Sequence, residues 1–245
     1  MRPARSGSAG IASEQSEPGG FAGRRCGFQC EYSRDVIPMG LYANCILPWF
    51  MDLALAPAAI AEQRAMLLRS LAGNVLEVGF GTGLSLRHYP KGVTRVIALD
   101  PKHPPLQRVA RRIAAAPFPV EYLPFDPDGP YPLAAGAVDA VASMFSLCTI
   151  PEPAAALRDI FRVLQPGGRF AFLEHGKAEQ PGLHRWQRRL TPLWGRFTGG
   201  CCLDRDIVAL VDAVGFDRVS HERVSVEGVP PWMGRLYRGV AIKPR

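Results

Sequence analysis

Residues 75–83 read Val-Leu-Glu-Val-Gly-Phe-Gly-Thr-Gly, an apolar run followed by alternating glycines. The apolar part predicts a buried strand, and Gly79, Gly81 and Gly83 allow positive φ and a close approach of backbone to a ligand. We expect the loop to open a helix whose free N–H groups favour an anion. Asp100 ends the next apolar run, 94–100, where an acidic residue typically binds ribose hydroxyls. The unit predicts a ribose-containing ligand with a negative group.

The glycine spacing narrows the choice of ligand. A dinucleotide loop has glycine at the place that Leu84 occupies here, so a nicotinamide oxidoreductase is disfavoured. A Gly-Lys-Ser/Thr sequence is missing from the loop, which excludes a phosphate-cradling P-loop. A ligand with a carboxylate, an ammonium and a ribose fits better, and S-adenosyl-L-methionine has these parts.

Around this loop, apolar runs alternate with helical periodicity. This alternation predicts an α/β fold with a mainly parallel sheet covered by helices on both faces. We expect strands near residues 75–78, 94–100, 119–123, 138–145, 169–175, 216–224 and 236–243, and helices near 62–71, 107–116, 153–164 and 207–215.

Three features in order resemble the class I S-adenosylmethionine-dependent methyltransferases, in particular the type 11 methyltransferase domain. They are Glu77 to Gly83, Asp100, and the turn Pro166-Gly167-Gly168. The resemblance implies a Rossmann-like, seven-stranded sheet in a single domain, with its last strand antiparallel. It implies S-adenosyl-L-methionine as cofactor, with Glu77, Gly79, Gly81, Gly83 and Asp100 in its site.

Four short motifs resemble a subgroup, the membrane-associated alkyl-thiol S-methyltransferases and related bacterial proteins. They are His88-Tyr89-Pro90, Ser146-Leu147-Cys148, Leu173-Glu174-His175 and Gly200-Cys201. The resemblance implies a small, apolar or amphipathic methyl acceptor, with a thiol favoured. A quinone precursor, a phenol or a phospholipid amine is the alternative acceptor, and a non-catalytic cofactor-binding protein of the same fold is the alternative function.

Several candidate site residues keep two interpretations. Glu77 supports either the loop or the methionine ammonium. Asp126 and Asp128 follow the third strand, where the family contacts adenine, although prolines there equally favour a turn capped by aspartates. His175 ends the fifth strand and is the candidate catalytic general base, or a histidine bonded to backbone. Cys148 is expected to be a packed thiol rather than a pocket residue.

The domain boundaries follow composition. We expect a disordered tail over residues 1–30, an N-terminal helical lid over 31–72 and the methyltransferase domain over 73–245. Prolines interrupt the apolar stretch 36–60, which therefore favours a lid or a membrane-contacting segment over a spanning helix. Within 177–203, an insert rich in arginine and tryptophan indicates an ordinary amphipathic helix, a substrate lid or a membrane-surface patch.

Composition excludes other classes. The chain has 245 residues, 47% of them hydrophobic, and a net charge of +7, which fits one globular domain and neither a disordered nor a polytopic membrane protein. Ser143 to Ser146 lack the Asp/Asn-Pro-Pro-aromatic motif of DNA amino-methyltransferases, so a nucleic-acid partner is not expected. The spacing of the six cysteines favours neither a disulfide framework nor a metal site. We expect a cytoplasmic protein, and leave open both a peripheral contact with a membrane and the oligomeric state.

Overall fold

The structure is a computed structural model that describes residues 46–101, 107–127, 129–227 and 229–245. The tail expected over 1–30, the first part of the expected lid and the candidate Asp128 lie outside the described residues.

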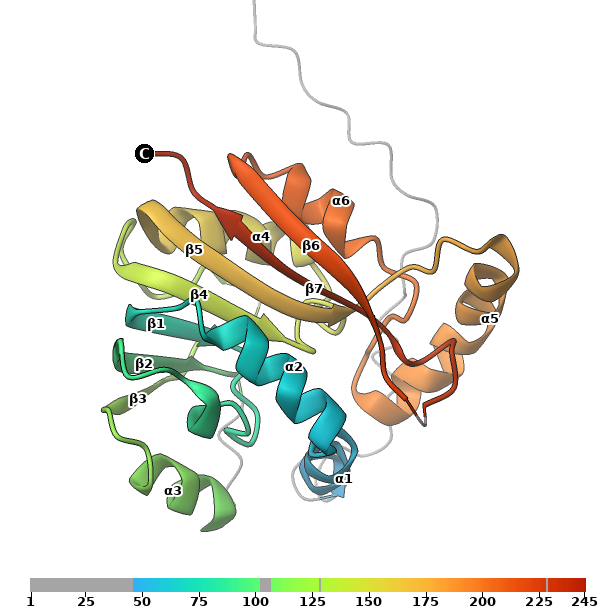
Figure 1. Cartoon of the computed structure of the whole chain (residues 1–245), viewed down its shortest axis with the longest axis horizontal. Coiled ribbons are helices and arrows are strands. Elements are labelled where there is room, and N and C mark those ends of the chain that lie inside the picture. The colour runs from blue at the N-terminus through green and yellow to red at the C-terminus, as the bar shows by residue number, and fades with distance from the viewer. Residues whose placement is uncertain (1–45, 102–106, 128, 228) are drawn as a thin grey trace, which may run out of the picture. The chain divides into compact units, whose positions relative to one another are not determined.

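The described chain contains a seven-stranded sheet in the order β3-β2-β1-β4-β5-β7-β6 (Figure 1). Six strands run parallel to one another, and β7 is antiparallel to both β5 and β6. This arrangement confirms the expected fold class, including the antiparallel last strand. The strands are β1 (Gly73–Val78), β2 (Val93–Leu99), β3 (Val120–Leu123), β4 (Val138–Met144), β5 (Leu164–His175), β6 (Arg218–Ser225) and β7 (Arg235–Ile242).

Helices cover both faces of the sheet because neighbouring strand residues point to opposite sides. Val75 packs in one core with α2 and α3, whereas Leu76 packs in the other core with α4 and α6. Figure 1 shows α2 on one side of the sheet and α4 and α6 on the other. The helices are α1 (Leu47–Leu55), α2 (Ala58–Leu68), α3 (Gln107–Ala114), α4 (Pro153–Val163), α5 (Pro181–Thr198) and α6 (Ile207–Asp212).

The carboxyl ends of the parallel strands meet at one edge of the sheet. β1 pairs with β2 on one side and β4 on the other, so the chain order reverses there. Crevices at such reversals are where open α/β sheets bind ligands. The edge therefore brings together the glycine loop after β1, Asp100 after β2, the segment after β4 and His175 at the end of β5.

The prediction of a helix directly after the glycine loop is wrong. The segment forms turns and a short 3₁₀ helix, η2 (Leu86–His88). Pro90 disfavours the α conformation at the residue before it, and Tyr89 is extended at ψ 135°. Six residues separate Gly83 from Pro90, and Pro90 keeps the last of them extended, so the segment closes in turns and the short η2. Anion binding by a helix N-terminus therefore does not apply to this loop.

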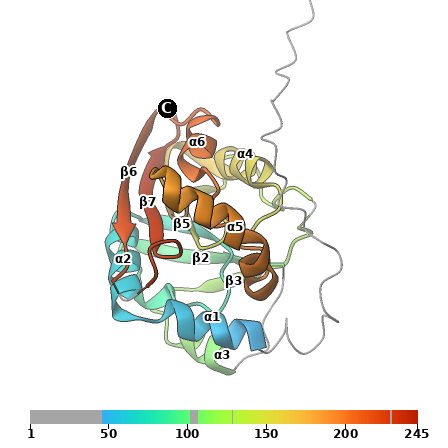
Figure 2. The same cartoon turned by 90° about the vertical axis from the view of Figure 1, so that its right-hand side faces the viewer.

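Two helices lie across the carboxyl edge, α1 from the expected lid and α5 from the basic insert (Figure 2). Gly199 at φ 72° ends α5, and a Cβ built there would lie 3.2 Å from Leu47 of α1. Among the described residues, no helix is both long and apolar enough to cross a membrane.

Candidate active site

All three glycines of the loop adopt positive φ, at 73° for Gly79, 56° for Gly81 and 72° for Gly83. The Gly79 N–H donates to the Leu99 carbonyl at 2.8 Å, which attaches the loop to β2. A Cβ built at Gly79 would lie 1.8 Å from Ser146 Oγ, so a side chain there would displace the segment after β4. Glycine is required at this position both for its φ and for this close approach.

Space beside the loop is open at its middle glycine. A Cβ built at Gly81 would meet only the Gly79 carbonyl oxygen, at 3.9 Å. The Gly81 N–H donates to Asp100 Oδ2 at 2.8 Å, so the carboxylate after β2 also fixes the loop. Asp100 is half-buried at the sheet edge. A backbone open to close approach beside a carboxylate suits a ligand with hydroxyl donors.

Glu77 lies beneath the loop, in the interior. It is 2% exposed and its Oε2 accepts a hydrogen bond from the Tyr89 hydroxyl at 3.0 Å. Burial raises the pKa of Glu77 to about 7, although hydrogen bonds from Ser85 and Tyr89 and the charge of Arg64 oppose the rise. These contacts support the loop. A carboxyl with a pKa near neutrality readily becomes a carboxylate when a cation approaches. A contact between Glu77 and the methionine ammonium therefore stays a prediction.

Of the two aspartates that we expect near adenine, the structure describes only Asp126. Asp126 lies in the exposed loop after β3, and its carbonyl oxygen accepts the Gly129 N–H at 2.9 Å in a turn. Asp128 lies outside the described residues. An adenine contact by either residue stays a prediction.

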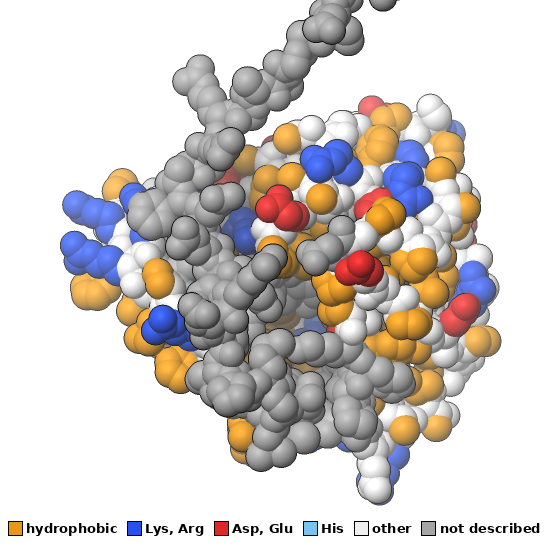
Figure 3. Space-filling model, turned by 180° about the vertical axis from the view of Figure 1, so that it is seen from behind, with side chains coloured by type: hydrophobic (Ala, Val, Ile, Leu, Met, Phe, Trp, Pro, Cys, Tyr) orange, Lys and Arg blue, Asp and Glu red, His pale blue; other side chains and the backbone are white. Residues whose placement is uncertain are grey.

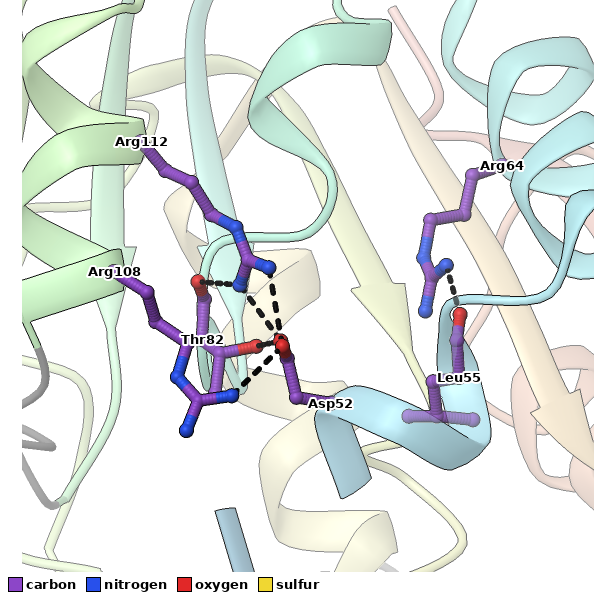
Figure 4. Close-up of polar contacts among 6 residues, drawn as sticks. All are labelled: Asp52, Leu55, Arg64, Thr82, Arg108 and Arg112. Atoms are coloured by element: carbon purple, nitrogen blue, oxygen red, sulfur yellow. Dashed lines mark hydrogen bonds and ion pairs between the residues drawn. The ribbon is translucent and has the colours of Figure 1, made fainter. Parts of the chain in front are cut away.

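The helix α1 is attached to the glycine loop by a charged cluster, which Figure 4 shows. Asp52 of α1 accepts hydrogen bonds from Thr82 Oγ1 at 2.6 Å, Arg112 at 2.7 Å and Arg108 at 3.1 Å. Arg112 also donates to the Thr82 carbonyl at 2.8 Å. Burial raises the pKa of Asp52, but the hydrogen bonds from Arg112, Thr82 and Arg108 outweigh it and lower the pKa to about 2. Helix α1, the glycine loop and α3 thus meet on one carboxylate.

A second arginine braces the turn between the two N-terminal helices. Arg64 of α2 is 3% exposed and donates to the Leu55 carbonyl at 2.7 Å (Figure 4). Its guanidinium also lies 5.9 Å from the centre of the Phe145 ring, at the end of β4. The turn is therefore held against the carboxyl edge of the sheet.

Sequence reasoning missed these polar contacts of α1 and α2. The available signal was Asp52 as the lone acidic residue of the apolar stretch 36–60, together with Arg108 and Arg112 one helical turn apart. Spacing alone did not indicate that the aspartate and the arginines meet.

Glu174 organises the segment after β4. It is fully buried, and its carboxylate accepts hydrogen bonds from four groups: Ser143 Oγ and the N–H groups of Ser146, Leu147 and Cys148, at 2.8–3.1 Å. Phe145 in this segment has φ 58°, a conformation that costs energy outside glycine. The Glu174 carboxylate therefore holds this strained turn in place.

His175 lies beside two thiols. Its Nδ1 is 3.6 Å from Cys201 Sγ and 3.9 Å from Cys148 Sγ, and the two sulfurs are 3.6 Å apart. The hydrogen bond with Cys201, followed by burial, raises the pKa of the Cys148 thiol well above its usual range. The structure thus assembles a histidine and two cysteines from three separate segments, a grouping that the sequence did not predict.

Comparisons with known proteins identify the family of this chain. Residues 76–172 match the family model described as "Methyltransferase domain". The chain is 33% identical over 188 residues to thiol S-methyltransferase TMT1B of Mus musculus, covering 72% of this chain and 74% of that protein. It belongs to the class I S-adenosylmethionine-dependent methyltransferases.

Two further similarities are informative about this methyltransferase. It is 29% identical over 203 residues to thiol S-methyltransferase TMT1A of Homo sapiens, covering 76% of this chain and 82% of that protein. Its fold is similar to that of the Haemonchus contortus N-methyltransferase 2 solved with phosphomonomethylethanolamine and S-adenosylhomocysteine. The TM-score is 0.62 at 15% identity, covering 81% of this chain and 57% of that one.

The family establishes S-adenosylmethionine as the methyl donor, and the residues of this methyltransferase fit it. The opening beside Gly81 admits a ligand to the backbone, and Asp100 supplies a carboxylate next to that opening. These are the groups that would receive the donor's amino-acid and ribose portions.

Proposed function

We propose that this enzyme transfers a methyl group to the thiol of a small apolar or amphipathic acceptor. The similarity that carries the proposal is the 33% identity over 188 residues to a thiol S-methyltransferase. The carboxyl edge of the sheet supports it, because sulfur and aromatic groups gather there. Phe145 contacts the His175 ring at 5.2 Å between centroids, and Cys148 and Cys201 lie beside that ring.

S-adenosylmethionine supplies a methyl group that its sulfonium already activates, so the chain has to bind, orient and exclude water. In the proposal, Gly79, Gly81, Gly83 and Asp100 hold the donor, with Glu77 near its ammonium. The helix α1, fixed by Asp52 to the loop, covers this side of the site.

An acceptor thiol reacts as thiolate and must lose a proton. His175 is the candidate general base for that step, because it ends β5 at the ligand-binding edge. We propose that Asp126 and Asp128 contact the adenine ring, because both follow β3 in the sequence.

Acceptor competition tests the proposal. We expect release of S-adenosylhomocysteine with hexanethiol and none above background with hexanol, which differs only in the reacting atom. The rate with the thiol should rise with pH as the thiolate fraction rises. Faster turnover of a hydroquinone, a phenol or phosphatidylethanolamine than of any thiol would contradict the thiol proposal and support the alternative acceptors.

We also propose that α5 and α1 contact an anionic membrane surface. The α5 sequence contains four arginines and no acidic residue. Trp186, Leu193 and Phe197 of α5 are 55–57% exposed, and Trp49 of α1 is 53% exposed. Basic and hydrophobic side chains lie together at the left edge of Figure 3, the side on which α5 lies. Such a mixed surface suits an interfacial contact with acidic lipids.

Vesicle co-sedimentation checks this contact. The protein should bind vesicles of phosphatidylcholine with phosphatidylserine, release in high salt, and bind pure phosphatidylcholine far less. The double variant Arg185→Gln and Arg189→Gln should lose binding, whereas Arg158→Gln, at an exposed position of α4, should keep it. Equal binding to both kinds of vesicle would contradict an electrostatic contact.

A further inference from the structure

Cys148, His175 and Cys201 are arranged with the spacing of metal ligands. Their three candidate ligand atoms all lie within 4.8 Å of one another. Two sulfurs bound tetrahedrally to zinc lie about 3.8 Å apart, and a sulfur and a nitrogen about 3.6 Å apart. The separations here are 3.6 Å for sulfur to sulfur and 3.6 and 3.9 Å for sulfur to Nδ1, so one ion fits with shifts of a few tenths of an ångström.

We propose that Cys148, His175 and Cys201 bind a Zn²⁺ ion and leave its fourth position open to an exogenous thiolate. Two cysteines and one histidine are a ligand set that zinc favours. Three protein ligands with one open position are typical of catalytic rather than structural zinc.

The segment that contains Cys148 is held in place before any metal binds. The Cys148 N–H donates to Glu174 at 3.1 Å, and the Cys148 carbonyl accepts the Cys202 N–H at 2.8 Å. Arg205 donates to the carbonyls of Leu147 and Ile150, the latter at 2.7 Å. Hydrogen bonds therefore connect the segment after β4 to the loop that contains Cys201, and the two sulfurs do not depend on a metal to meet.

The neighbouring thiol serves as a comparison within the chain. Cys202 is also buried, but its sulfur lies 3.6 Å from the Gly200 carbonyl and 3.6 Å from Arg205. Of the described residues, only Cys148, His175 and Cys201 make up the ligand group. Cys202→Ser is therefore a matched control for loss of one buried thiol.

The role of the open position rests on the proposed function, whereas the metal site itself does not. An acceptor thiol that coordinates the ion loses its proton to solvent, because zinc binds the thiolate. The new bond joins acceptor sulfur to zinc, and a bound water leaves. His175 would then hold the ion through Nδ1 instead of acting as the general base. The ion would lie at the sheet edge beside the cofactor loop, because Ser146, two residues before Cys148, contacts Gly79.

Metal titration tests the ion itself without reference to methylation. The full chain, reduced and freed of metal, should bind one Zn²⁺. Cys148→Ser and Cys201→Ser should each raise the apparent Kd for this ion at least about 100-fold, beyond the loss usual for a supporting contact. Cys202→Ser should bind like the unmodified chain. Circular dichroism and a thermal melt of each variant separate loss of ligand from loss of fold.

Cobalt substitution counts the ligands and probes the open position. Co²⁺ in the site should show sulfur-to-cobalt charge-transfer absorption that falls by about half in either cysteine variant, since each removes one of two thiolates. Adding hexanethiol without cofactor should increase this absorption, and hexanol should not. Metal binding unaffected by both cysteine variants, or a Cys148–Cys201 disulfide in the purified chain, would overturn the metal site. A cobalt spectrum unchanged by thiol would overturn the open position, whereas failure of the proposed function alone would appear as metal and thiol binding without thiol methylation.

Discussion

Asp100→Asn is expected to weaken S-adenosylmethionine binding at least about tenfold, on the order of 1.4 kcal/mol. Asp100 accepts the Gly81 N–H at 2.8 Å, at the loop glycine where a built Cβ would meet no atom nearer than the Gly79 carbonyl oxygen at 3.9 Å. Asparagine keeps the shape but removes the charge and one acceptor, and its NH₂ group would face hydroxyl donors of the ligand. Calorimetric titration of the purified variant measures the loss directly.

A matched substitution separates this effect from general loss of charge. Asp212→Asn removes an exposed carboxylate at the end of α6 and should leave the dissociation constant unchanged. Because Asp100 also fixes the loop, chemical denaturation of each variant shows whether any lost affinity comes from unfolding. Unchanged affinity in a folded Asp100→Asn protein would remove Asp100 from the cofactor site.

Much of the fold could be predicted because its signals are local. An apolar run covered on both faces reads as a continuous strand, and the predicted 94–100 corresponds to β2 at Val93–Leu99. The chain order of the methyltransferase motifs then placed Asp100 and the glycine loop at one sheet edge, where the structure joins them by a hydrogen bond. Local pattern is misleading after Gly83, because Pro90 disfavours the helical conformation at the residue before it.

The polar contacts of the site could not be predicted, because they join residues far apart in sequence. Glu174 reaches the segment after β4 across 26–31 residues, and its neighbour His175 meets Cys201 from a third segment. A periodicity shows which face a residue lies on, but not which partner stands opposite. The same applies to Asp52, whose partners follow it by 30 to 60 residues.

Asp52→Asn is expected to loosen α1 from the cofactor loop. The charged cluster is partly buried, since Asp52 is 12% exposed and its two arginines 30–34%, so we expect a loss of about 1–2 kcal/mol in local stability. Hydrogen exchange in α1 should then quicken by roughly 5- to 30-fold, which exchange measured by mass spectrometry resolves. Glu62→Gln, an exposed carboxylate on α2, is the matched control and should leave exchange in α1 unchanged.

Acid should reproduce the effect of this substitution in the unmodified chain. The pKa of Asp52 is lowered from 3.8 to about 2, so its stabilising contribution is complete above about pH 4 and is lost as pH falls toward 2. Asp52→Asn should lack this component of the acid dependence.

Because Thr82 of the loop bonds the same carboxylate, cofactor binding should slow exchange in α1 of the unmodified chain and do so less in the variant. Equal protection by cofactor in both proteins would show that α1 and the glycine loop are not coupled through Asp52.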